Sequence, residues 1–301
     1  MSTENLEGRT IAEYHLLQRI GEGGTAIVYK AKGPDGEICA VKILKERLRL
    51  DETAVKRFLR EAEFGSRVDH PAVARTYDYG KEEGIYYLGM EWIDGVPLSR
   101  HIKSTSRMPI STVVSVVEQM AAALEASHGV GIIHRDLKPD NIMFDPQTNN
   151  AKLLDFGIAR DAQVEPAERL TRAGFFVGTL QYVAPEALSG ELVGESADIY
   201  SLSKITFHML TGTNPHAGSS PRELFQKLLQ SKPTPLNQAV RGLKFPLALE
   251  AAIMKGLARK PEDRQPSVSD FAREVTAGSV SGDGAMAGGF FNKVKGLFDR
   301  A

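Results

Sequence analysis

A short run of polar and charged residues near the middle of the chain constrains its chemistry more than any other feature. The run reads His134-Arg135-Asp136-Leu137-Lys138-Pro139-Asp140-Asn141, and Asp155-Phe156-Gly157 begins fourteen residues after Asn141. Asp136, Asn141 and Asp155 carry oxygen atoms, which magnesium prefers as ligands, and Lys138 carries a cation. A charged surface turn would explain His134-Arg135-Asp136 taken alone. The whole set at this spacing indicates a site that holds a phosphoryl group and its metal ions beside a hydroxyl nucleophile.

These motifs resemble those of the protein kinase family. The resemblance implies that Asp136 orients the attacking hydroxyl group and accepts its proton, while Lys138 stabilises the γ-phosphate. It also implies that Asn141 and Asp155 bind the metal. The expected cofactors are therefore ATP and Mg²⁺, and Mn²⁺ could replace the magnesium. Such a transfer needs positioning and charge neutralisation more than covalent chemistry, which fits a set of acids, a lysine and glycines.

Length, charge and cysteine content limit the other possibilities. A chain of 301 residues with 42% hydrophobic residues is long enough for one large or two modest cores. The 37 basic and 38 acidic residues leave a net charge of -1, so no binding to nucleic acid is expected. The single cysteine, Cys39, excludes an internal disulfide and fits a reducing cytosol. It is expected to fill the core rather than to react.

Targeting signals are missing from the sequence, which predicts a cytoplasmic location. Residues 1–10 are polar and lack the apolar segment of a signal peptide. No run approaches the roughly 18 apolar residues that a membrane helix needs.

A glycine-rich segment lies between two apolar stretches near the N-terminus. The pattern predicts a β-hairpin that begins at Tyr14. A glycine cluster by itself usually marks only a turn. The resemblance implies that this loop covers the ATP phosphates, because backbone N–H groups approach closely where no Cβ intervenes. The residues concerned are Gly21, Glu22, Gly23, Gly24, Thr25 and Ala26. Ala26 stands where the family has its third glycine.

Lys42 lies in a near-continuous apolar run, from Ile38 to Ile43, that predicts a buried strand. Burial of an unpaired ammonium group is costly, so Lys42 needs an anion. The helix predicted from Glu52 to Val68 offers Glu61 and Glu63. Two residues on a helix are about 200° apart, so only one of them can face Lys42. The resemblance selects Glu61, and it adds the α- and β-phosphates of ATP as partners of Lys42.

Two further strands, Val73 to Tyr79 and Ile85 to Glu91, are predicted around a turn at residues 81–84. The resemblance implies that the second strand leads into a hinge beside the nucleotide. Met90 would close the back of the pocket, while Glu91 and Ile93 would offer backbone groups to adenine. The apolar walls around the ring would be Ile20, Val28, Ala40 and Met143. Pro97 falls near the position of the family's ribose-binding acid, so the ribose contact has no assigned residue.

The second half of the sequence is mainly helical in pattern. Apolar residues at helical spacing predict a long helix from Ile110 to Gly129, with the terminal glycine as its C-cap. The resemblance implies that this helix supports the catalytic run. His134 is expected to pack and to form hydrogen bonds. Asp198 either caps the helix that begins at Ser196 or, by resemblance, braces the catalytic run from below.

Two features of this half concern its interior. Arg264 matches the family arginine that pairs with Glu186, and loss of that pair is expected to destabilise the fold. Ser203 and Lys204 stand where the family usually has a glycine and an apolar residue, which argues against deep burial of that helical turn.

The segment from Asp155 to Glu186 carries the expected signals for acceptor class and regulation. By resemblance, Lys138 and Thr179 match the serine/threonine kinases, because tyrosine kinases carry other residues at both places. Arg135 is expected to be a buried cation in need of an anion, and Arg160 could join it. A phosphothreonine adds about two negative charges, so autophosphorylation of Thr171 is expected to order the segment. Carboxylates could satisfy Arg135 instead.

The end of the chain differs in composition. Residues 278–289 are rich in glycine, serine and alanine, which is typical of a flexible linker. Residues 290–301 place their large apolar side chains on one helical face. Three interpretations stay open: a helix that binds a membrane surface or a partner, a helix that docks on the chain itself, and a frayed tail.

Together these features predict an α+β chain with the two-lobed protein kinase fold. The expected divisions are an N-terminal tail (1–9), a kinase domain (10–277, with an N-lobe of about 10–93 and a C-lobe of about 94–277) and a tail (278–301). The expected function is transfer of the γ-phosphate of ATP to serine and threonine hydroxyls of proteins, with Thr171 and Thr179 as regulatory phosphosites and a homodimer for trans-autophosphorylation. The alternatives are a pseudokinase scaffold and a kinase-like small-molecule phosphotransferase.

Overall fold

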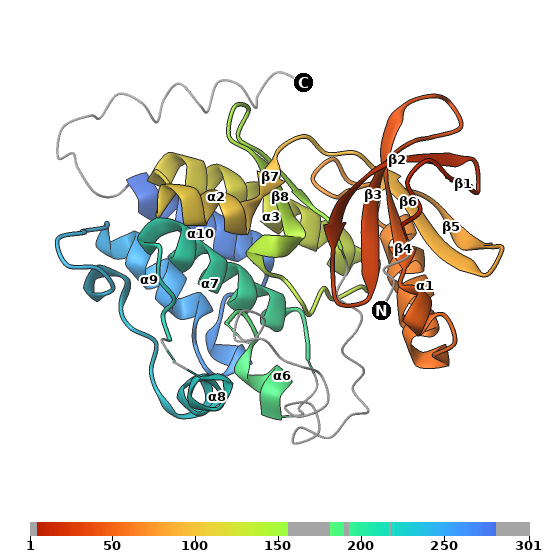
Figure 1. Cartoon of the computed structure of the whole chain (residues 1–301). Helices are drawn as coiled ribbons and strands as arrows, with labels where there is room; N and C mark the ends of the chain where they lie inside the picture. Colours follow the sequence, from red (N-terminus) through yellow and green to blue (C-terminus); the bar gives the residue numbers. More distant parts are fainter. Residues whose placement is uncertain (1–4, 156–180, 190–192, 217, 219, 281–301) are drawn as a thin grey trace.

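The computed structural model describes residues 5–155, 181–189, 193–216, 218 and 220–280. Figure 1 shows a smaller part built from strands and helix α1, and a larger part built mainly from helices. We call them the N-lobe and the C-lobe. The predicted α+β fold with a β-rich N-lobe and a helical C-lobe is therefore confirmed.

The N-lobe is organised around one antiparallel sheet of six strands in the order β1-β2-β3-β4-β6-β5. The strands are β1 (Thr10–Ile11), β2 (Tyr14–Glu22), β3 (Ala26–Lys32), β4 (Ile38–Leu44), β5 (Thr76–Glu82) and β6 (Ile85–Glu91). Alternate side chains of a strand point to opposite faces. One face holds a cluster that includes Leu16, Tyr29 and Val41, together with the buried Cys39. The other face packs on α1.

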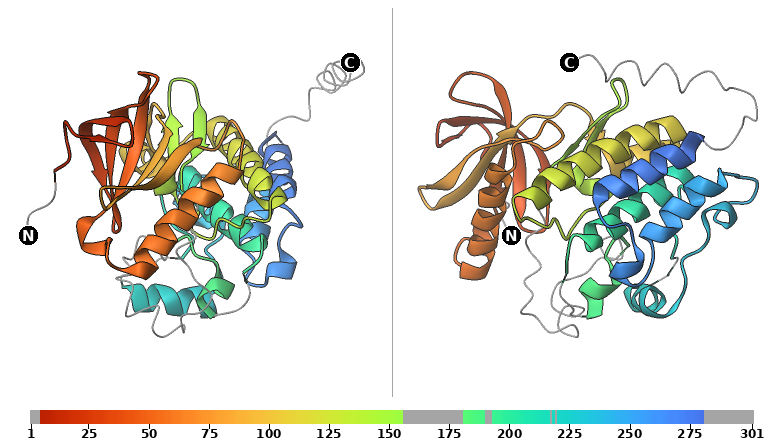
Figure 2. Two further views of the ribbon diagram at one scale, coloured as in Figure 1. Left: turned by 90° about the vertical axis from the view of Figure 1, so that its right-hand side faces the viewer. Right: turned by 180° about the vertical axis from the view of Figure 1, so that it is seen from behind.

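Helix α1 (Glu52–Arg67) begins at a defined cap. The Asp51 side chain accepts hydrogen bonds from the N–H groups of Thr53 and Ala54, at 2.9 and 3.1 Å. This satisfies N–H groups that have no partner within the helix. Phe58 and Ala62 are buried against the sheet, as Figure 2 shows for the helix as a whole. This packing orients Glu61 toward β4.

The turn between β5 and β6 is tighter than predicted. Strand β5 continues to Glu82, so the turn consists of Glu83 and Gly84 rather than residues 81–84. Their φ angles are 47° and 81°. A two-residue turn with both angles positive matches the twist of the paired strands, which explains why the ladder extends farther than the polar sequence indicated.

The C-lobe surrounds its core with helices, and Figure 2 shows several of them side by side in the view from behind. Its helices are α2 (Leu98–Thr105), α3 (Ile110–Gly129), α6 (Pro185–Ser189), α7 (Ser196–Thr211), α8 (Pro221–Gln230), α9 (Leu247–Gly256) and α10 (Val268–Val280). A small sheet is formed by β7 (Val96–Pro97), β8 (Ile142–Asp145) and β9 (Asn150–Leu153). The 3-10 turn η2 (Pro139–Asn141) precedes β8, and in the N-lobe the 3-10 turn η1 (Glu46–Leu48) lies between β4 and α1. In the described ranges no helix has the length and apolar character needed to cross a bilayer.

The C-terminal end of α3 differs from the prediction that Gly129 is its C-cap. The C-cap is Val130, and Gly131 rather than Gly129 adopts a left-handed φ, of 76°. The N–H groups of Gly131 and Ile132 then donate to carbonyls of the last helical turn. The chain reverses at Gly131 because Ile132 has to enter the core directly afterwards, where it is 2% exposed.

A buried ion pair holds α6 to the segment before α10. Arg264 donates from both terminal nitrogens to the two carboxylate oxygens of Glu186, at 2.7 and 2.8 Å. The same guanidinium group also donates to the carbonyls of Ala258, Arg259 and Ser196. The predicted pair is confirmed. Because every donor direction has an acceptor, the cost of burying the charge is offset.

Lys204 is buried without such compensation. Both Ser203 and Lys204 are 0% exposed in the middle of α7, so the expectation of shallow burial was wrong. The hydroxyl of Ser203 donates to the carbonyl of Ile199, which makes its burial inexpensive. Among the described residues, Lys204 Nζ has no hydrogen-bond partner and lies 5.5 Å from the ring centroid of Tyr200. Burial lowers the pKa of this lysine from 10.5 to about 7.

We predict that Lys204→Met stabilises the protein. Between pH 7 and 10.5 the unfolded state holds a proton on Lys204 that the folded state has lost, so the free energy of unfolding rises with pH in this window. The penalty is complete below pH 7 and disappears above 10.5. Urea unfolding should show a gain of about 2–4 kcal/mol at mildly acidic pH that shrinks as the pH is raised.

The exposed Lys244 provides the control for this substitution. Lys244→Met should change the free energy of unfolding by less than about 0.5 kcal/mol at any pH. An equal gain from Lys204→Met at low and high pH would show that the amine is not held in its neutral form.

Candidate active site

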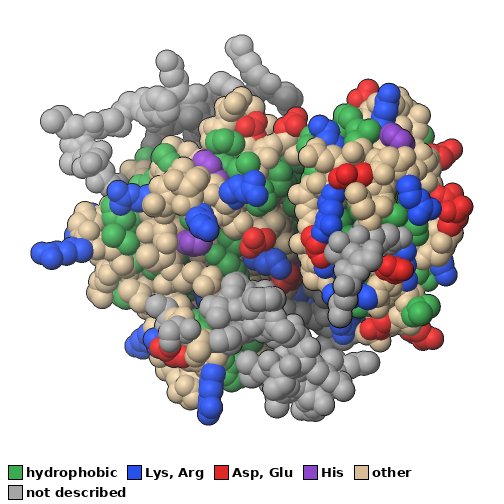
Figure 3. Space-filling model, in the orientation of Figure 1, with side chains coloured by type: hydrophobic (Ala, Val, Ile, Leu, Met, Phe, Trp, Pro, Cys, Tyr) green, Lys and Arg blue, Asp and Glu red, His purple; other side chains and the backbone are tan. Residues whose placement is uncertain are grey.

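The two lobes meet at a groove, which Figure 3 shows as a hollow with acidic and basic side chains along part of it. Lys42, in the middle of β4, donates from Nζ to Glu61 Oε1 at 2.5 Å and to Asp155 Oδ2 at 3.0 Å. Glu61 comes from α1, and Asp155 lies 113 residues beyond Lys42, just after β9. The structure therefore brings one cation and two carboxylates from three separate segments to one place.

Electrostatics fix the charge of Lys42. Its side chain is only 12% exposed. Burial alone would lower the pKa of the lysine, but the carboxylates of Asp155 and Glu61 outweigh that effect and raise it. Lys42 is therefore a cation at physiological pH. A cation held by two acids at the edge of a groove is placed to meet the negative phosphates of a nucleotide.

The polar run of the C-lobe forms a compact loop opposite Lys42. Lys138 Nζ donates to Asp136 Oδ2 at 2.8 Å, and both side chains are 22% exposed. Asn141 Nδ2 donates to the backbone carbonyl of Asp136 at 3.0 Å, which leaves Oδ1 as the acceptor of this amide. The Leu154 N–H donates to the Asn141 carbonyl at 2.9 Å. This last bond connects the loop with the residue that precedes Asp155.

The oxygen atoms of Asn141 and Asp155 suit a magnesium ion. One carboxylate and one amide oxygen are hard ligands, and magnesium is usually bound by few protein groups together with water and phosphate oxygens. In the described part of the chain no three His, Cys, Asp or Glu side chains gather as a closed metal centre. One carboxylate and one amide oxygen would leave the other positions around such an ion to water and phosphate oxygens.

Asp198 supports the loop from inside the C-lobe. It is the third residue of α7, is 0% exposed, and does not act as the N-cap. Its Oδ2 and Oδ1 accept hydrogen bonds from the N–H groups of His134 and Arg135, each at 2.9 Å. Arg135 has a φ of 64°. The carboxylate thus stabilises a strained turn directly before Asp136, as the brace interpretation of Asp198 requires.

His128 is a residue of the site that the sequence reasoning missed. Its Nε2 lies 2.8 Å from Asp198 Oδ2, and its side chain is 7% exposed. His128 is near the C-terminal end of α3, so it connects this helix with α7 through the same carboxylate. His128 belongs to none of the recognised motifs, so nothing in the sequence indicated this contact.

His134 lies behind the loop with an exposure of 0%. Burial lowers the pKa of its imidazole, although Asp198 and Asp136 oppose the effect. A neutral, fully buried imidazole fits the packing role expected for His134. Arg135 differs from its prediction, because its side chain is exposed and not buried. The positive φ turns it away from the core.

The glycine-rich segment forms the turn between β2 and β3. Gly23 N–H donates to the Ala26 carbonyl at 2.8 Å, which closes the turn and places Gly24 and Thr25 at its tip. Two basic residues that the sequence reasoning missed hold this tip. Arg47 donates to the Gly24 carbonyl at 2.9 Å, and Lys45 forms an ion pair with Glu22.

The residues expected to enclose adenine come from β2, β3, β4, β6 and β8. Met90 and Ala40 are paired across β4 and β6, and each is 8% exposed. Val28 and Met143 are half-buried, while Ile20 is 46% exposed. The Glu91 side chain points away to Lys152, and its N–H donates to the Arg75 carbonyl at 2.8 Å. Because the N–H of Glu91 is already engaged, its carbonyl is the backbone group that remains for the contact with adenine expected at this residue.

Several predicted residues lie outside the described part of the chain. They are Thr171, Thr179, Arg160 and the tail 290–301.

Comparison with known proteins gives a consistent result. Residues 14–273 match the sequence profile described as Protein kinase domain. The chain is 35% identical over 282 residues to serine/threonine-protein kinase pkn3 of Myxococcus xanthus, with 91% of this chain and 52% of that protein covered. It is 36% identical over 266 residues to PknH of Mycobacterium tuberculosis, with 88% and 42% covered. The chain thus spans about half the length of these curated relatives or less.

A solved structure is also similar. The PknI kinase domain of Mycobacterium tuberculosis superposes with a TM-score of 0.69 at 26% identity, covering 91% of this chain and 99% of that one.

We predict that Asp198→Asn weakens the hydrogen bonds that hold the turn at His134 and Arg135. An amide offers one acceptor oxygen where the carboxylate offers two, so the N–H of His134 or Arg135 loses its partner in a buried site. Thermal unfolding should show a loss of about 1–3 kcal/mol, and amide exchange at residues 134 and 135 should accelerate.

Asp263→Asn supplies the matched control, since Asp263 is exposed. It should leave both measurements unchanged. Unchanged exchange at residues 134 and 135 in Asp198→Asn would show that the carboxylate does not hold the loop.

Proposed function

Because the chain belongs to the protein kinase family, we propose that it is a serine/threonine kinase that transfers the γ-phosphate of ATP to hydroxyl groups of proteins. One observation carries the proposal. The ion-paired Lys42, Glu61 and Asp155 converge on the same groove as the loop that holds Asp136, Lys138 and Asn141.

The loop residues supply positioning and neutralisation. Asp136 accepts a hydrogen bond from the acceptor hydroxyl and takes its proton as the new P–O bond forms, while the bond from the γ-phosphorus to the bridging oxygen breaks and ADP leaves. Lys138, already paired with Asp136 at 2.8 Å, offers its remaining N–H bonds to the transferred phosphoryl group. Lys42 balances the charge of the α- and β-phosphates, and Glu61 keeps its ammonium group in place.

Asn141 and Asp155 would hold magnesium, which neutralises charge on the β- and γ-phosphates when bound. Their hard oxygen atoms favour Mg²⁺, and Mn²⁺ is the substitute of similar preference. The tip at Gly24 and Thr25 would cover the phosphates. Met90, Ala40, Val28, Met143 and Ile20 would enclose adenine, with the Glu91 carbonyl and the Ile93 backbone as its polar contacts.

Serine and threonine as acceptors are supported by the relatives, which are named serine/threonine-protein kinases. Lys138 in the loop agrees with that acceptor class. We further propose a kinase domain of residues 10–277, divided near residue 93, that works in the cytoplasm. Autophosphorylation at Thr171 or Thr179 within a transient homodimer would regulate it, and residues 290–301 would contact a membrane surface or a partner.

The proposal predicts the behaviour of Asp136→Asn. With labelled ATP and magnesium, the wild-type protein should phosphorylate itself or a generic basic protein. The variant should lose at least about 100-fold in kcat, because it lacks the proton acceptor, while calorimetry still shows ATP binding. ATP binding without transfer by the wild type would favour a pseudokinase scaffold. Transfer to small alcohols alone would favour a small-molecule phosphotransferase.

A second prediction concerns Glu61→Gln. The substitution removes one of two carboxylates from Lys42, so the ammonium group should shift toward Asp155 and leave the phosphates less well bound in the transition state. The expected loss in kcat is about 10–100-fold. Glu63→Gln is the matched control, because Glu63 lies two residues away on the same helix with an exposed side chain. Equal effects of both substitutions would contradict the role of Glu61.

A further inference from the structure

A second ion pair connects the two lobes, at the end of β6 where the hinge is expected. Lys152 Nζ, on β9 of the small C-lobe sheet, pairs with Glu91 Oε1, on the last residue of β6. The two side chains are 26% and 27% exposed, so the pair is largely shielded from water. Along β6, Glu91 lies three residues from Leu88, the ladder partner of Lys42, which is about 10 Å along the strand. The pair is therefore separate from the contacts of Lys42.

Glu91 is held by its backbone N–H and by both oxygens of its carboxylate. The N–H donates to the Arg75 carbonyl at 2.8 Å, and Oε2 accepts a hydrogen bond from the Arg75 N–H at 3.2 Å. Lys152 holds the other oxygen, Oε1. A residue fixed at its N–H and at its side chain has little freedom to turn. The direction of the Glu91 carbonyl, the group expected to meet adenine, therefore depends on these contacts.

Lys152 also lies beside a residue expected to enclose adenine. It is directly opposite Met143 in the pairing of β8 with β9, and Met143 is in turn opposite Pro97 of β7. Residues directly opposite in an antiparallel pair carry their side chains on the same face, with Cβ atoms about 5 Å apart. Lys152 thus connects the strand beside one wall of the expected adenine site with the strand that supplies the carbonyl.

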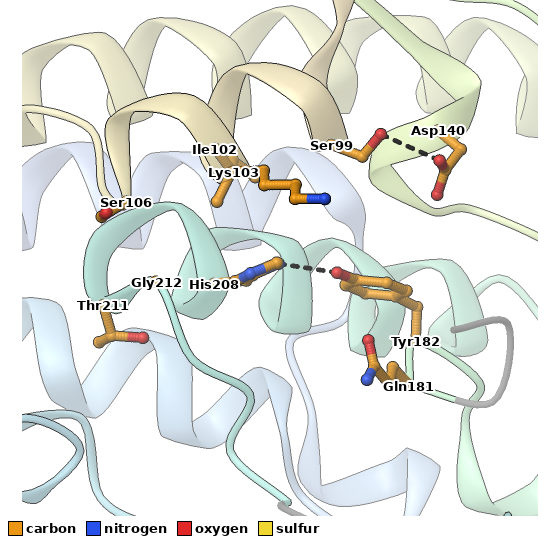
Figure 4. A pocket seen from close by; sticks show the side chains of 10 residues that line it. All are labelled: Ser99, Ile102, Lys103, Ser106, Asp140, Gln181, Tyr182, His208, Thr211 and Gly212. Carbon is orange, nitrogen blue, oxygen red and sulfur yellow. Dashed lines mark hydrogen bonds between the residues drawn. The ribbon is translucent and has the colours of Figure 1, made fainter. Parts of the chain in front are cut away.

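The small sheet is anchored without Lys152. Ser99 Oγ, in α2, donates to Asp140 Oδ1 at 2.9 Å, close before β8, as Figure 4 shows. In β9 the N–H and the carbonyl of Leu153 each form a hydrogen bond of 2.8 Å with the backbone of residues 72–74. Substitution of Lys152 should therefore leave β8 and β9 in place. Its effect should fall on the carboxylate at the end of β6.

We propose that Lys152 is a positioning residue for the nucleotide base, and that its ion pair with Glu91 makes the site select adenine over guanine. The inference rests on nucleotide binding in the proposed function and adds the specificity for the base. A carbonyl accepts a hydrogen bond from the 6-amino group of adenine, whereas guanine has an oxygen acceptor at the same position. Two acceptors that face each other repel, and a carbonyl that is held in place cannot turn away from guanine.

An ion pair that merely stabilises the fold is the competing explanation. Its loss would lower the unfolding temperature but would treat ATP and GTP alike. The preference for one base is therefore the measurement that separates the two explanations.

The test compares Lys152→Met with the wild-type protein in transfer to a generic basic protein, with ATP and GTP in turn. The KM for ATP should rise about fivefold to tenfold while kcat changes less than about twofold, because the base is bound equally in the ground state and the transition state. The KM for GTP should change less than about twofold, so the preference for ATP in kcat/KM should fall about fivefold. Lys152→Arg keeps the cation and should restore most of the preference.

Two further variants complete the test. Lys255→Met removes an ion pair of 2.7 Å with Glu274, between α9 and α10, and should leave both KM values unchanged. Glu91→Gln keeps an acceptor oxygen for the Arg75 N–H but removes the charge, so it should reproduce the effect of Lys152→Met. The effects of the two substitutions should not add in the double variant. Glu91→Gln also decides the question if Lys152→Met does not fold.

Calorimetry of ATP and GTP binding measures the same preference without turnover. A preference for ATP that Lys152→Met and Glu91→Gln leave unchanged would overturn the inference alone, as would equal binding of ATP and GTP by the wild-type protein. Binding of ATP without transfer would remove the proposed function, and the ratio of the two affinities in the variants would still decide the inference. A wild-type protein that binds neither nucleotide would remove both.

Discussion

The ion pairs of Lys42 hold the candidate site together. A lysine in a buried strand is tolerated only if acids compensate its charge, and here one acid comes from α1 and the other from the segment after β9. The two lobes are therefore linked by the charge requirement of one side chain. Any movement of α1 away from the sheet would leave Lys42 with a single carboxylate.

On the C-lobe side, the carboxylate of Asp198 also holds separate segments together. Asp198 is fully buried in α7 and holds the turn before Asp136 through two backbone N–H groups, while His128 adds a contact from α3. The loop has hydrogen bonds of its own at Asn141, and this carboxylate adds two at the turn of His134 and Arg135. A rigid helix inside the core thus sets the position of residues at the surface of the groove, as precise chemistry requires.

The interior of the C-lobe contains two buried basic side chains whose hydrogen-bonding environments are opposite. Arg264 satisfies its donors with Glu186 and three carbonyls, whereas Lys204 has no hydrogen-bond partner in the described part of the chain. The first connects α6 with the segment before α10. The second is predicted to lower the stability of the fold. Burial of a charge is therefore no sign of function by itself, and its partners decide what it does.

Periodic patterns in the sequence predicted the limits of β4, β6, α1 and α3 to within one residue, because such patterns report local structure directly. The family resemblance of the spaced motifs supplied the two-lobed fold, the Glu61 partner of Lys42 and the Arg264–Glu186 pair. Tertiary structure alone decided the contact of His128 with Asp198, the hydrogen bond of Arg47 to Gly24, the exposure of Arg135 and the burial of Lys204. The two contacts join segments that are far apart in the chain, and the two exposures depend on what packs around each side chain. No local pattern encodes them, since side-chain contacts depend on how whole elements pack.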